Sequence, residues 1–193
     1  KVSVTVDGSA KVEILDDYVP FSALPFTDLP DKYWATDAIT YVYAHGLFSG
    51  TTPIDFSPDD TMTRGMLWTV LSRLNGTDTG STAGGNYYDA ARTWAMKSGI
   101  TDGSNPDSAV TREQVSAILC RYAALKGYDT TATGTIGKFS DAGSVSGYAS
   151  DALKWAVGSG ILQGSDGALL PQAGAQRDQM SAILERFMQN IAK

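Results

Sequence analysis

The chain has 193 residues, of which 42% are hydrophobic and 19% are charged, a balance typical of globular proteins with a sizeable core. Its formal net charge of −6 argues against nucleic acid as a partner, because phosphate binding normally leaves a basic footprint. Cys120 is the single cysteine, which excludes an internal disulfide and a multi-cysteine metal site. The sequence has no apolar run long enough to span a bilayer and no signal-peptide pattern at its start, so we expect no membrane insertion.

Residues 1–20 predict a short N-terminal β-hairpin. Polar and apolar side chains alternate in residues 1–6 and again in residues 11–14, and Asp7-Gly8 between them is a strong tight-turn signal. A lone hairpin is only marginally stable in water. We therefore expect residues 1–20 to be the remnant of a preceding domain.

A pattern that occurs three times organises the rest of the chain. Each copy has an aromatic residue close to an Asp, a helix with an aromatic-Ala pair, Gly-[Leu/Ile]-x-x-Gly, a Pro, and an Arg that opens a second helix. The glycine element lies at Gly46–Gly50, Gly99–Gly103 and Gly160–Gly164. A period of roughly fifty to sixty residues built on a helix pair is typical of a repeat array, in which each copy buries its apolar face against its neighbours.

Two stretches rich in Gly, Thr, Ser and Ala predict linkers at residues 77–86 and 128–137, because such segments cannot bury enough apolar area to form a core. The predicted repeats are therefore residues 21–76, 87–127 and 138–193. The second copy has the shortest interval between its Asp and its glycine turn, so we expect it to have lost a loop or the first turn of its first helix, and we take a shortened first helix as the prediction. Trp34 and Tyr148 lie at equal distances before the glycine, and we expect the shorter second copy to lack a partner for them.

The second helix of each copy is expected to begin after Thr63, Thr111 or Gln176. Residues 111–114, Thr-Arg-Glu-Gln, fit a capping box, in which the Thr hydroxyl and the Gln side chain satisfy N–H groups at the helix start. Apolar residues then recur at i, i+3, i+4 and i+7, and three equivalent stripes predict a three-helix bundle as the core. The stripes are Leu67, Val70, Leu71 and Leu74; Val115, Ile118, Leu119 and Tyr122; and Met180, Ile183, Leu184 and Phe187.

The recurring signature resembles the S-layer homology (SLH) domain family over residues 21–193, because the glycine element, the Pro and the helix-opening Arg occur in fixed order. The resemblance implies a mainly α fold, with three tandem helix-loop-helix repeats in a pseudo-threefold arrangement around a central three-helix bundle. It also implies a non-catalytic, extracellular module on the bacterial cell wall or S-layer surface, which binds an acidic, pyruvylated secondary cell-wall polysaccharide in inter-repeat grooves. An upstream cargo domain of the same polypeptide is the second expected partner.

The arginine that opens each second helix is the main candidate for a ligand contact. A cation is slightly disfavoured at a helix start, so its recurrence there favours a functional interpretation. A planar guanidinium can bind a carboxylate through two parallel hydrogen bonds, and a pyruvyl ketal presents a carboxylate. The alternative is a structural clamp, in which each arginine pairs with an aspartate of the same or the next copy. The arginines are Arg64, Arg112 and Arg177, and the aspartates are Asp28, Asp89 and Asp141.

Aromatic residues and glycines complete the predicted site. Aromatic rings offer flat apolar faces to a sugar, although aromatics at helical spacing equally favour a place in the core. Glycines allow the backbone to approach a ligand closely, but they more often end a helix and turn the chain. The aromatic candidates are Trp34, Trp94, Tyr148 and Trp155, and the glycine candidates are Gly50, Gly103 and Gly164.

Other recurrent residues are assigned structural or peripheral roles. Arg73, Arg121 and Arg186 fall near helix C-termini, where a cation complements the helix dipole. Trp68 aligns with serine in the other two copies, so we expect an exposed side chain that could contact a partner domain.

Two alternatives to an anchoring module stay open. A glycoside hydrolase needs two carboxyl groups in one cleft, roughly 5 to 9.5 Å apart, but the acidic residues recur once per copy and no unique pair stands out. We therefore predict no catalytic residue, no metal and no cofactor. A structural module for self-assembly or for docking of an adjacent protein domain is the second alternative. It predicts that loss of the arginines lowers stability without a separate loss of glycan binding.

Overall fold

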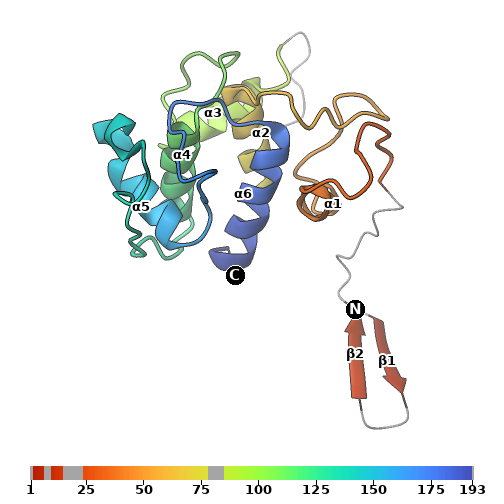
Figure 1. The fold of residues 1–193 in the computed structure, drawn as a ribbon. Coiled ribbons are helices and arrows are strands. Elements are labelled where there is room, and N and C mark those ends of the chain that lie inside the picture. Colours follow the sequence, from red (N-terminus) through yellow and green to blue (C-terminus); the bar gives the residue numbers. More distant parts are fainter. Residues whose placement is uncertain (1, 7–9, 15–23, 78–84, 193) are drawn as a thin grey trace.

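The computed structural model describes residues 2–6, 10–14, 24–77 and 85–192, and this part of the chain is mainly α-helical (Figure 1). The predicted mainly α class is confirmed, and each predicted repeat contributes one pair of α-helices. The pairs are α1 (Thr36–Ala44) and α2 (Arg64–Leu74), α3 (Asp89–Lys97) and α4 (Arg112–Leu125), and α5 (Ser150–Gly158) and α6 (Arg177–Asn190). Two short 3-10 helices, η2 (Ala142–Ser144) and η3 (Gly147–Ala149), precede α5.

The predicted hairpin is present as two antiparallel strands, β1 (Val2–Val6) and β2 (Ala10–Ile14), with Val4 opposite Val12. The predicted turn at Asp7-Gly8 lies outside the described residues, as does most of the predicted linker 77–86. The origin of the hairpin in a preceding domain stays a prediction.

Side-chain caps explain where two of the second helices begin. The predicted capping box is confirmed, because the Thr111 hydroxyl accepts from the Gln114 N–H and the Gln114 side chain accepts from the Thr111 N–H. The Thr63 hydroxyl caps α2 by accepting from the Met66 N–H at 3.2 Å. Gln176 makes no such cap at α6. Two of these helix starts are therefore encoded locally, as the sequence predicted.

The first helices of the three repeats have the same length. Helices α1, α3 and α5 each contain nine residues, and the following glycines, Gly46, Gly99 and Gly160, turn the chain with φ of 65°, 72° and 71°. The predicted shortening of the first helix in the second repeat is wrong, and the alternative of a lost loop fits instead. The residues that the second copy lacks belong to the loop before the helix, where the third copy has η2 and η3.

The segments that enter α2, α4 and α6 are joined by a closed cycle of backbone hydrogen bonds. The Met62 N–H donates to the Ala175 carbonyl at 2.9 Å, the Val110 N–H to the Met62 carbonyl at 2.9 Å, and the Ala175 N–H to the Val110 carbonyl at 3.0 Å. Each bond joins a different pair of repeats. The third repeat is thereby connected back to the first.

Helix packing follows the same cyclic order. Helix α3 packs against α2, α5 against α4, and α1 against α6, so these pairs join different repeats. In Figure 1, α5 and α1 lie on opposite sides of α4 and α6. The predicted stripes enter one continuous core, in which Leu74 alone of the twelve stripe residues is only partly buried. The ring centroids of Tyr122 and Phe187 are 6.0 Å apart and connect α4 with α6.

Trp68 is fully buried, so the prediction of an exposed contact for a partner domain is wrong. The aligned Ser116 and Ser181 are buried as well. Each second helix packs against the first helix of the following repeat, so little of its surface is left to solvent. The polar residue type of the two serines was therefore a misleading signal of exposure.

Candidate functional site

The three helix-opening arginines each reach into a loop of the next repeat. Arg112 donates from Nε to the Leu169 carbonyl at 2.8 Å and from Nη2 to the Gln163 carbonyl at 2.9 Å. Arg177 does the same with the carbonyls of Phe56 and Ser49, both at 2.8 Å. Arg64 donates from Nε to the Ser104 carbonyl at 2.9 Å. The guanidinium groups therefore connect successive repeats, and the third returns to the first.

Backbone groups at the helix starts strengthen the same connections. The N–H groups of Arg64, Arg112 and Arg177 donate to the carbonyls of Ser108, Ala173 and Asp60, at 3.0, 3.0 and 2.9 Å. These are donors that a helix leaves without an intrahelical partner. Each second helix thus satisfies part of its N-terminus with the loop of a neighbouring repeat.

Arg112 and Arg177 are buried, and burial lowers the pKa of both guanidinium groups. An arginine in a protein nevertheless stays protonated at neutral pH. The Arg177 guanidinium carbon lies 4.6 Å from the Phe56 ring centroid and 5.1 Å from that of Phe48. Cation–π contacts of this kind add to the carbonyl contacts.

The predicted aspartates hold the loops that receive the arginines. Asp28 accepts from the N–H groups of Phe56 and Ser57 at 2.9 and 2.7 Å. Asp141 accepts from the N–H groups of Leu169 and Leu170 at 2.8 and 2.7 Å. The clamp therefore differs from an arginine–aspartate pair. The arginines bind backbone carbonyls, and Asp28 and Asp141 hold the loops that carry those carbonyls.

Asp89 does not repeat this role. It is the first residue of α3 and accepts from the Asn86 N–H at 2.7 Å. In the second repeat Asp102 takes over the loop, because it accepts from the N–H of Ser104 at 3.0 Å. Asp102 lies within the Gly99–Gly103 element, but the other copies have Ser49 and Gln163 at this position. Sequence comparison among the copies therefore gave no signal for it.

Three grooves lie between the repeats and share the same parts: a face of a second helix, the loop after the glycine turn, an aromatic ring and two arginines. We name each groove after its helix. The α2 groove, of about 340 Å³, contains residues 48–51, Tyr87, Arg73 and Arg177. The α4 groove, of about 420 Å³, contains residues 101, 102, 104 and 105, Tyr148, Arg64 and Arg121. The α6 groove, of about 680 Å³, contains residues 162–165, Trp34, Arg112 and Arg186.

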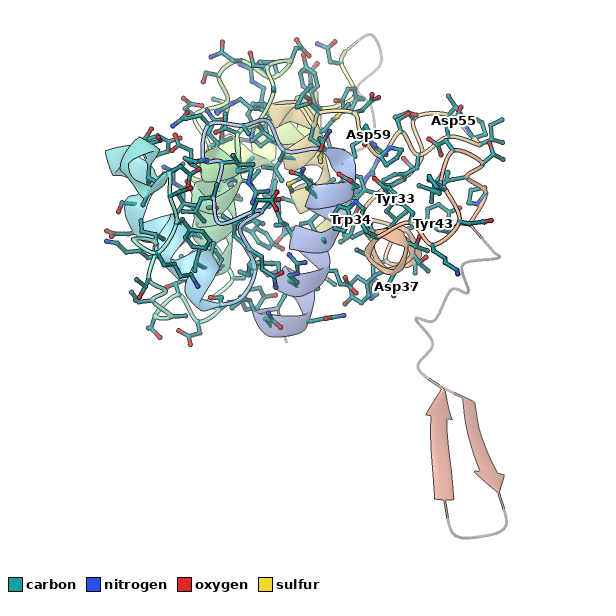
Figure 2. The ribbon with its side chains drawn as sticks, viewed as in Figure 1. Tyr33, Trp34, Asp37, Tyr43, Asp55 and Asp59 are labelled. Carbon is teal, nitrogen blue, oxygen red and sulfur yellow. The ribbon has the colours of Figure 1, made fainter. Side chains whose placement is uncertain are left out.

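The aromatic rings of the grooves come from one equivalent position. Trp34, Tyr87 and Tyr148 are 59%, 50% and 58% exposed, and each lies two residues before the first helix of its repeat. Tyr87 is therefore the partner that we expected the second copy to lack. Figure 2 shows Trp34 and Tyr33 between helices α1 and α6.

The two other predicted aromatics lie elsewhere. Trp155 is buried, and its indole N–H donates to the Asp129 carbonyl at 3.2 Å. Trp94 is partly buried, with its ring centroid 6.4 Å from that of Tyr122. Two locations were left open for the aromatic residues. Trp94 and Trp155 pack in the core, whereas Trp34 and Tyr148 line grooves.

Buried carboxylates anchor two tyrosines at the groove rims. The Tyr148 hydroxyl donates to Glu113 at 3.0 Å, and the Tyr33 hydroxyl donates to Asp178 at 2.7 Å. Burial, followed by the hydrogen bond to Glu113, raises the pKa of Tyr148 to about 12. Burial and the hydrogen bond to Asp178 raise the pKa of Tyr33 as well. Both hydroxyls stay protonated and keep donating at neutral pH.

The predicted glycines have packing roles. A Cβ atom on Gly50 would lie 2.7 Å from the Phe26 ring, and one on Gly164 would collide with the Phe139 ring. Gly103 has φ of 72°, in the left-handed region that favours glycine. Gly50 and Gly164 also line the α2 and α6 grooves, so close packing places their backbone at the groove walls.

Arg73, Arg121 and Arg186 line the three grooves, which the sequence analysis did not foresee. Arg73 donates to the Leu47 carbonyl at 2.9 Å and Arg121 to the Ile100 carbonyl at 3.2 Å, near the helix ends. The signal that could have found them is their recurrence nine positions after the helix-opening arginines. Nine residues is two and a half helical turns, so the two arginines of a helix serve different grooves.

Within residues 24–77 and 85–192, no group of three or more His, Cys, Asp and Glu side chains is placed to hold a metal ion. No helix in the described part of the chain has the length and apolar character needed to cross a membrane.

Comparison with known proteins identifies relatives of this chain. The sequence model of the S-layer homology domain matches residues 25–65 and 138–181. The chain is 25% identical over 185 residues to an endoglucanase of Bacillus sp. (strain KSM-635), 25% over 176 residues to the surface-layer 125 kDa protein of Lysinibacillus sphaericus, and 35% over 80 residues to the cellulosome-anchoring protein of Acetivibrio thermocellus. These matches cover 89%, 82% and 39% of this chain, but 19%, 14% and 18% of the relatives.

Proposed function

This chain belongs to the S-layer homology family, a non-catalytic cell-surface module, and from that premise we propose that it anchors a longer polypeptide to the bacterial cell wall. The ligand is an acidic, pyruvylated secondary cell-wall polysaccharide, bound in the grooves between the repeats. The chain spans less than a fifth of the relatives named above, and their names include an enzyme and a surface-layer protein. Both facts support an anchoring module with cargo upstream in the same polypeptide.

We further infer a pseudo-threefold arrangement of three repeats around α2, α4 and α6. Three independent sets of contacts support it. The backbone cycle through Met62, Val110 and Ala175, the arginine-to-carbonyl contacts and the helix pairs all connect the repeats in one cyclic order.

The observation that carries the proposal is that every groove combines two guanidinium groups with an exposed aromatic ring. A guanidinium is suited to a carboxylate, and an aromatic face is suited to the apolar face of a sugar or a ketal methyl. Three linked grooves of modest affinity raise the overall avidity for a repeating polymer through their effective concentration.

The ligand and clamp roles of the arginines divide between two sets. Arg112 and Arg177 are buried and make several contacts to the loop of the next repeat, so they suit the clamp. Arg73 and Arg121 are exposed in the same type of groove. We assign the first contact with a ligand carboxylate to the exposed arginines, Arg73 and Arg121. The buried arginines, Arg112 and Arg177, add positive charge deeper in their grooves.

Binding to purified wall sacculi, before and after acid removal of pyruvyl groups, tests this function. The triple variant Trp34→Ala, Tyr87→Ala, Tyr148→Ala removes one exposed ring from every groove. Ile54→Ala removes an exposed apolar side chain that does not line the grooves and is the control. We expect pyruvyl-dependent sedimentation of the wild-type and control proteins, and its loss in the folded triple variant.

The structural alternative, self-assembly or docking of an adjacent domain, is supported by the clamp contacts of Arg112 and Arg177. It predicts no sedimentation of the wild type with pyruvylated walls. That result would reject the glycan ligand.

A further inference from the structure

The three grooves share their parts but differ in charge. The α2 groove has Arg73 and Arg177 and no carboxylate in its lining. The α6 groove contains two carboxylates, Asp59 and Asp178; the Asp178 carboxylate accepts the hydroxyl of Tyr33 at 2.7 Å, and neither forms an ion pair with an arginine among the described residues. In the α4 groove, by contrast, a carboxylate oxygen of Asp102 lies 2.8 Å from Nη2 of Arg64. Within the described residues, this is the one ion pair that an arginine forms.

We propose that Asp102 occupies the α4 groove as an internal substitute for an acidic ligand, so that this groove rejects the acidic sugars that the other two grooves accept. The inference rests on the proposed function, because it concerns the same grooves. It makes Asp102 a residue that determines specificity.

The equivalent contacts in the other grooves support this assignment. Ser49 and Gln163 stand at the position of Asp102, and there Nη2 of the incoming arginine binds the backbone carbonyl, at 2.8 and 2.9 Å. A backbone carbonyl carries no net charge, so it does not neutralise the guanidinium that it binds. In the α4 groove the same Nη2 binds a side-chain carboxylate, which cancels that charge.

Asp102 is also held by its neighbour Ser104, at the same oxygen that contacts Arg64. Its Oδ1 accepts from the N–H of Ser104 at 3.0 Å and from the Ser104 hydroxyl at 2.9 Å. These hydrogen bonds lead the causes that hold the pKa of Asp102 below its usual value, so it is charged at neutral pH. A ligand carboxylate that enters the α4 groove meets a like charge at a position where the arginines of the other two grooves bind only a neutral backbone carbonyl.

The side chain can be changed without opening the core. The Asp102 side chain is 69% exposed, whereas that of Arg64 is 13% exposed. Asp102→Ser copies the residue of the α2 groove. Asp102→Asn keeps an oxygen that can accept from Ser104 and removes only the charge, which guards against a folding defect in the serine variant.

A residue-resolved NMR titration of the full ¹⁵N-labelled chain tests the inference. The probe is a methyl hexoside with a 4,6-pyruvyl ketal, and its methyl ester is the uncharged matched probe. Backbone signals of residues 49–51, 101–105 and 163–165 report on the α2, α4 and α6 grooves separately. Asp151→Asn, which changes net charge at an exposed site paired with Lys154, is the control variant.

We expect the acid to shift the α2 and α6 signals of the wild type at concentrations that leave the α4 signals unchanged. Either Asp102 variant should raise the affinity of the α4 groove for the acid by at least ~10-fold, with little change for the ester or in Asp151→Asn. Unchanged α4 signals in both folded Asp102 variants, or equal responses of all three grooves in the wild type, overturn the inference. If the α2 and α6 signals still respond, the proposed function stands; if no groove responds to the acid, both fall.

Discussion

A buried guanidinium destabilises a protein unless its charge and donors are satisfied, and at Arg112 three donors have partners: the carbonyls of Leu169 and Gln163 and the side chain of Gln179. Arg112→Ala removes these bonds and leaves acceptors at a repeat boundary unpaired. We expect the free energy of unfolding to fall by about 2–4 kcal/mol. Arg121→Ala, an exposed arginine on the same helix, should cost less than about 1 kcal/mol. Equal losses in urea unfolding would contradict the clamp role.

Glu113 and Glu185 should have opposite effects on how stability changes with pH. Burial alone would raise the pKa of Glu113, but bonds from the N–H and hydroxyl of Ser146 hold it below its usual value. Its stabilising effect is therefore present above the unfolded pKa and is lost as the pH falls through the folded pKa. Burial raises the pKa of Glu185, so its effect is present below the unfolded pKa and is lost as the pH rises through the folded pKa. The free energy of unfolding is measured with urea from pH 3 to pH 7. Relative to the wild type, the loss caused by Glu113→Gln should be largest at pH 7, whereas Glu185→Gln should raise the free energy of unfolding at pH 7. Parallel curves for both variants and the wild type would refute the assignment.

At the scale of elements, the start of α4 depends on a local cap. The Thr111 hydroxyl accepts from the Gln114 N–H, while Gln176 at the start of α6 makes no equivalent bond. Thr111→Ala should therefore lower the free energy of unfolding by about 1 kcal/mol. Gln176→Ala should change it by less than about 0.5 kcal/mol. Thermal or urea unfolding of the two variants measures the difference, and similar losses would show that the cap is not what stabilises α4.

The second helices and the core could be predicted because their signals are local. The cap at Thr111 and the stripe that ends at Tyr122 follow from spacing within one helix. The residues that line the grooves could not be predicted from local spacing, because Arg177 and its carbonyl partner Ser49 are 128 residues apart in the sequence. Tyr87 was missed since Tyr-Tyr-Asp resembles the aromatic-x-Asp of the other copies, although Asp89 opens a helix and Asp28 holds a loop. The two segments were aligned by residue type, but the structural role of each residue depends on its distance from the glycine turn.

At the scale of the whole molecule, each groove is assembled from all three repeats. The α2 groove takes its helix and loop from the first repeat, Tyr87 from the second and Arg177 from the third. The α4 and α6 grooves follow the same rule in cyclic order. The contacts that close the cycle also complete the grooves, so the binding proposed above requires all three repeats to be folded. A repeat array of this kind differs from a linear stack, in which each repeat contacts only its neighbours in sequence.

This coupling predicts the effect of removing one repeat. A chain that ends at residue 127 lacks α6 and Arg177, so it leaves the apolar face of α1 uncovered and the carbonyls of Ser49 and Phe56 without their donor. We expect this fragment to lose cooperative urea unfolding and all pyruvyl-dependent binding to sacculi, instead of keeping about two thirds of each. Removal of residues 1–14 is the control, because β1 and β2 pack against each other, and it should leave both properties unchanged. A two-repeat fragment that unfolds cooperatively and still binds would mean that the cycle is dispensable and that a groove can be completed within two repeats.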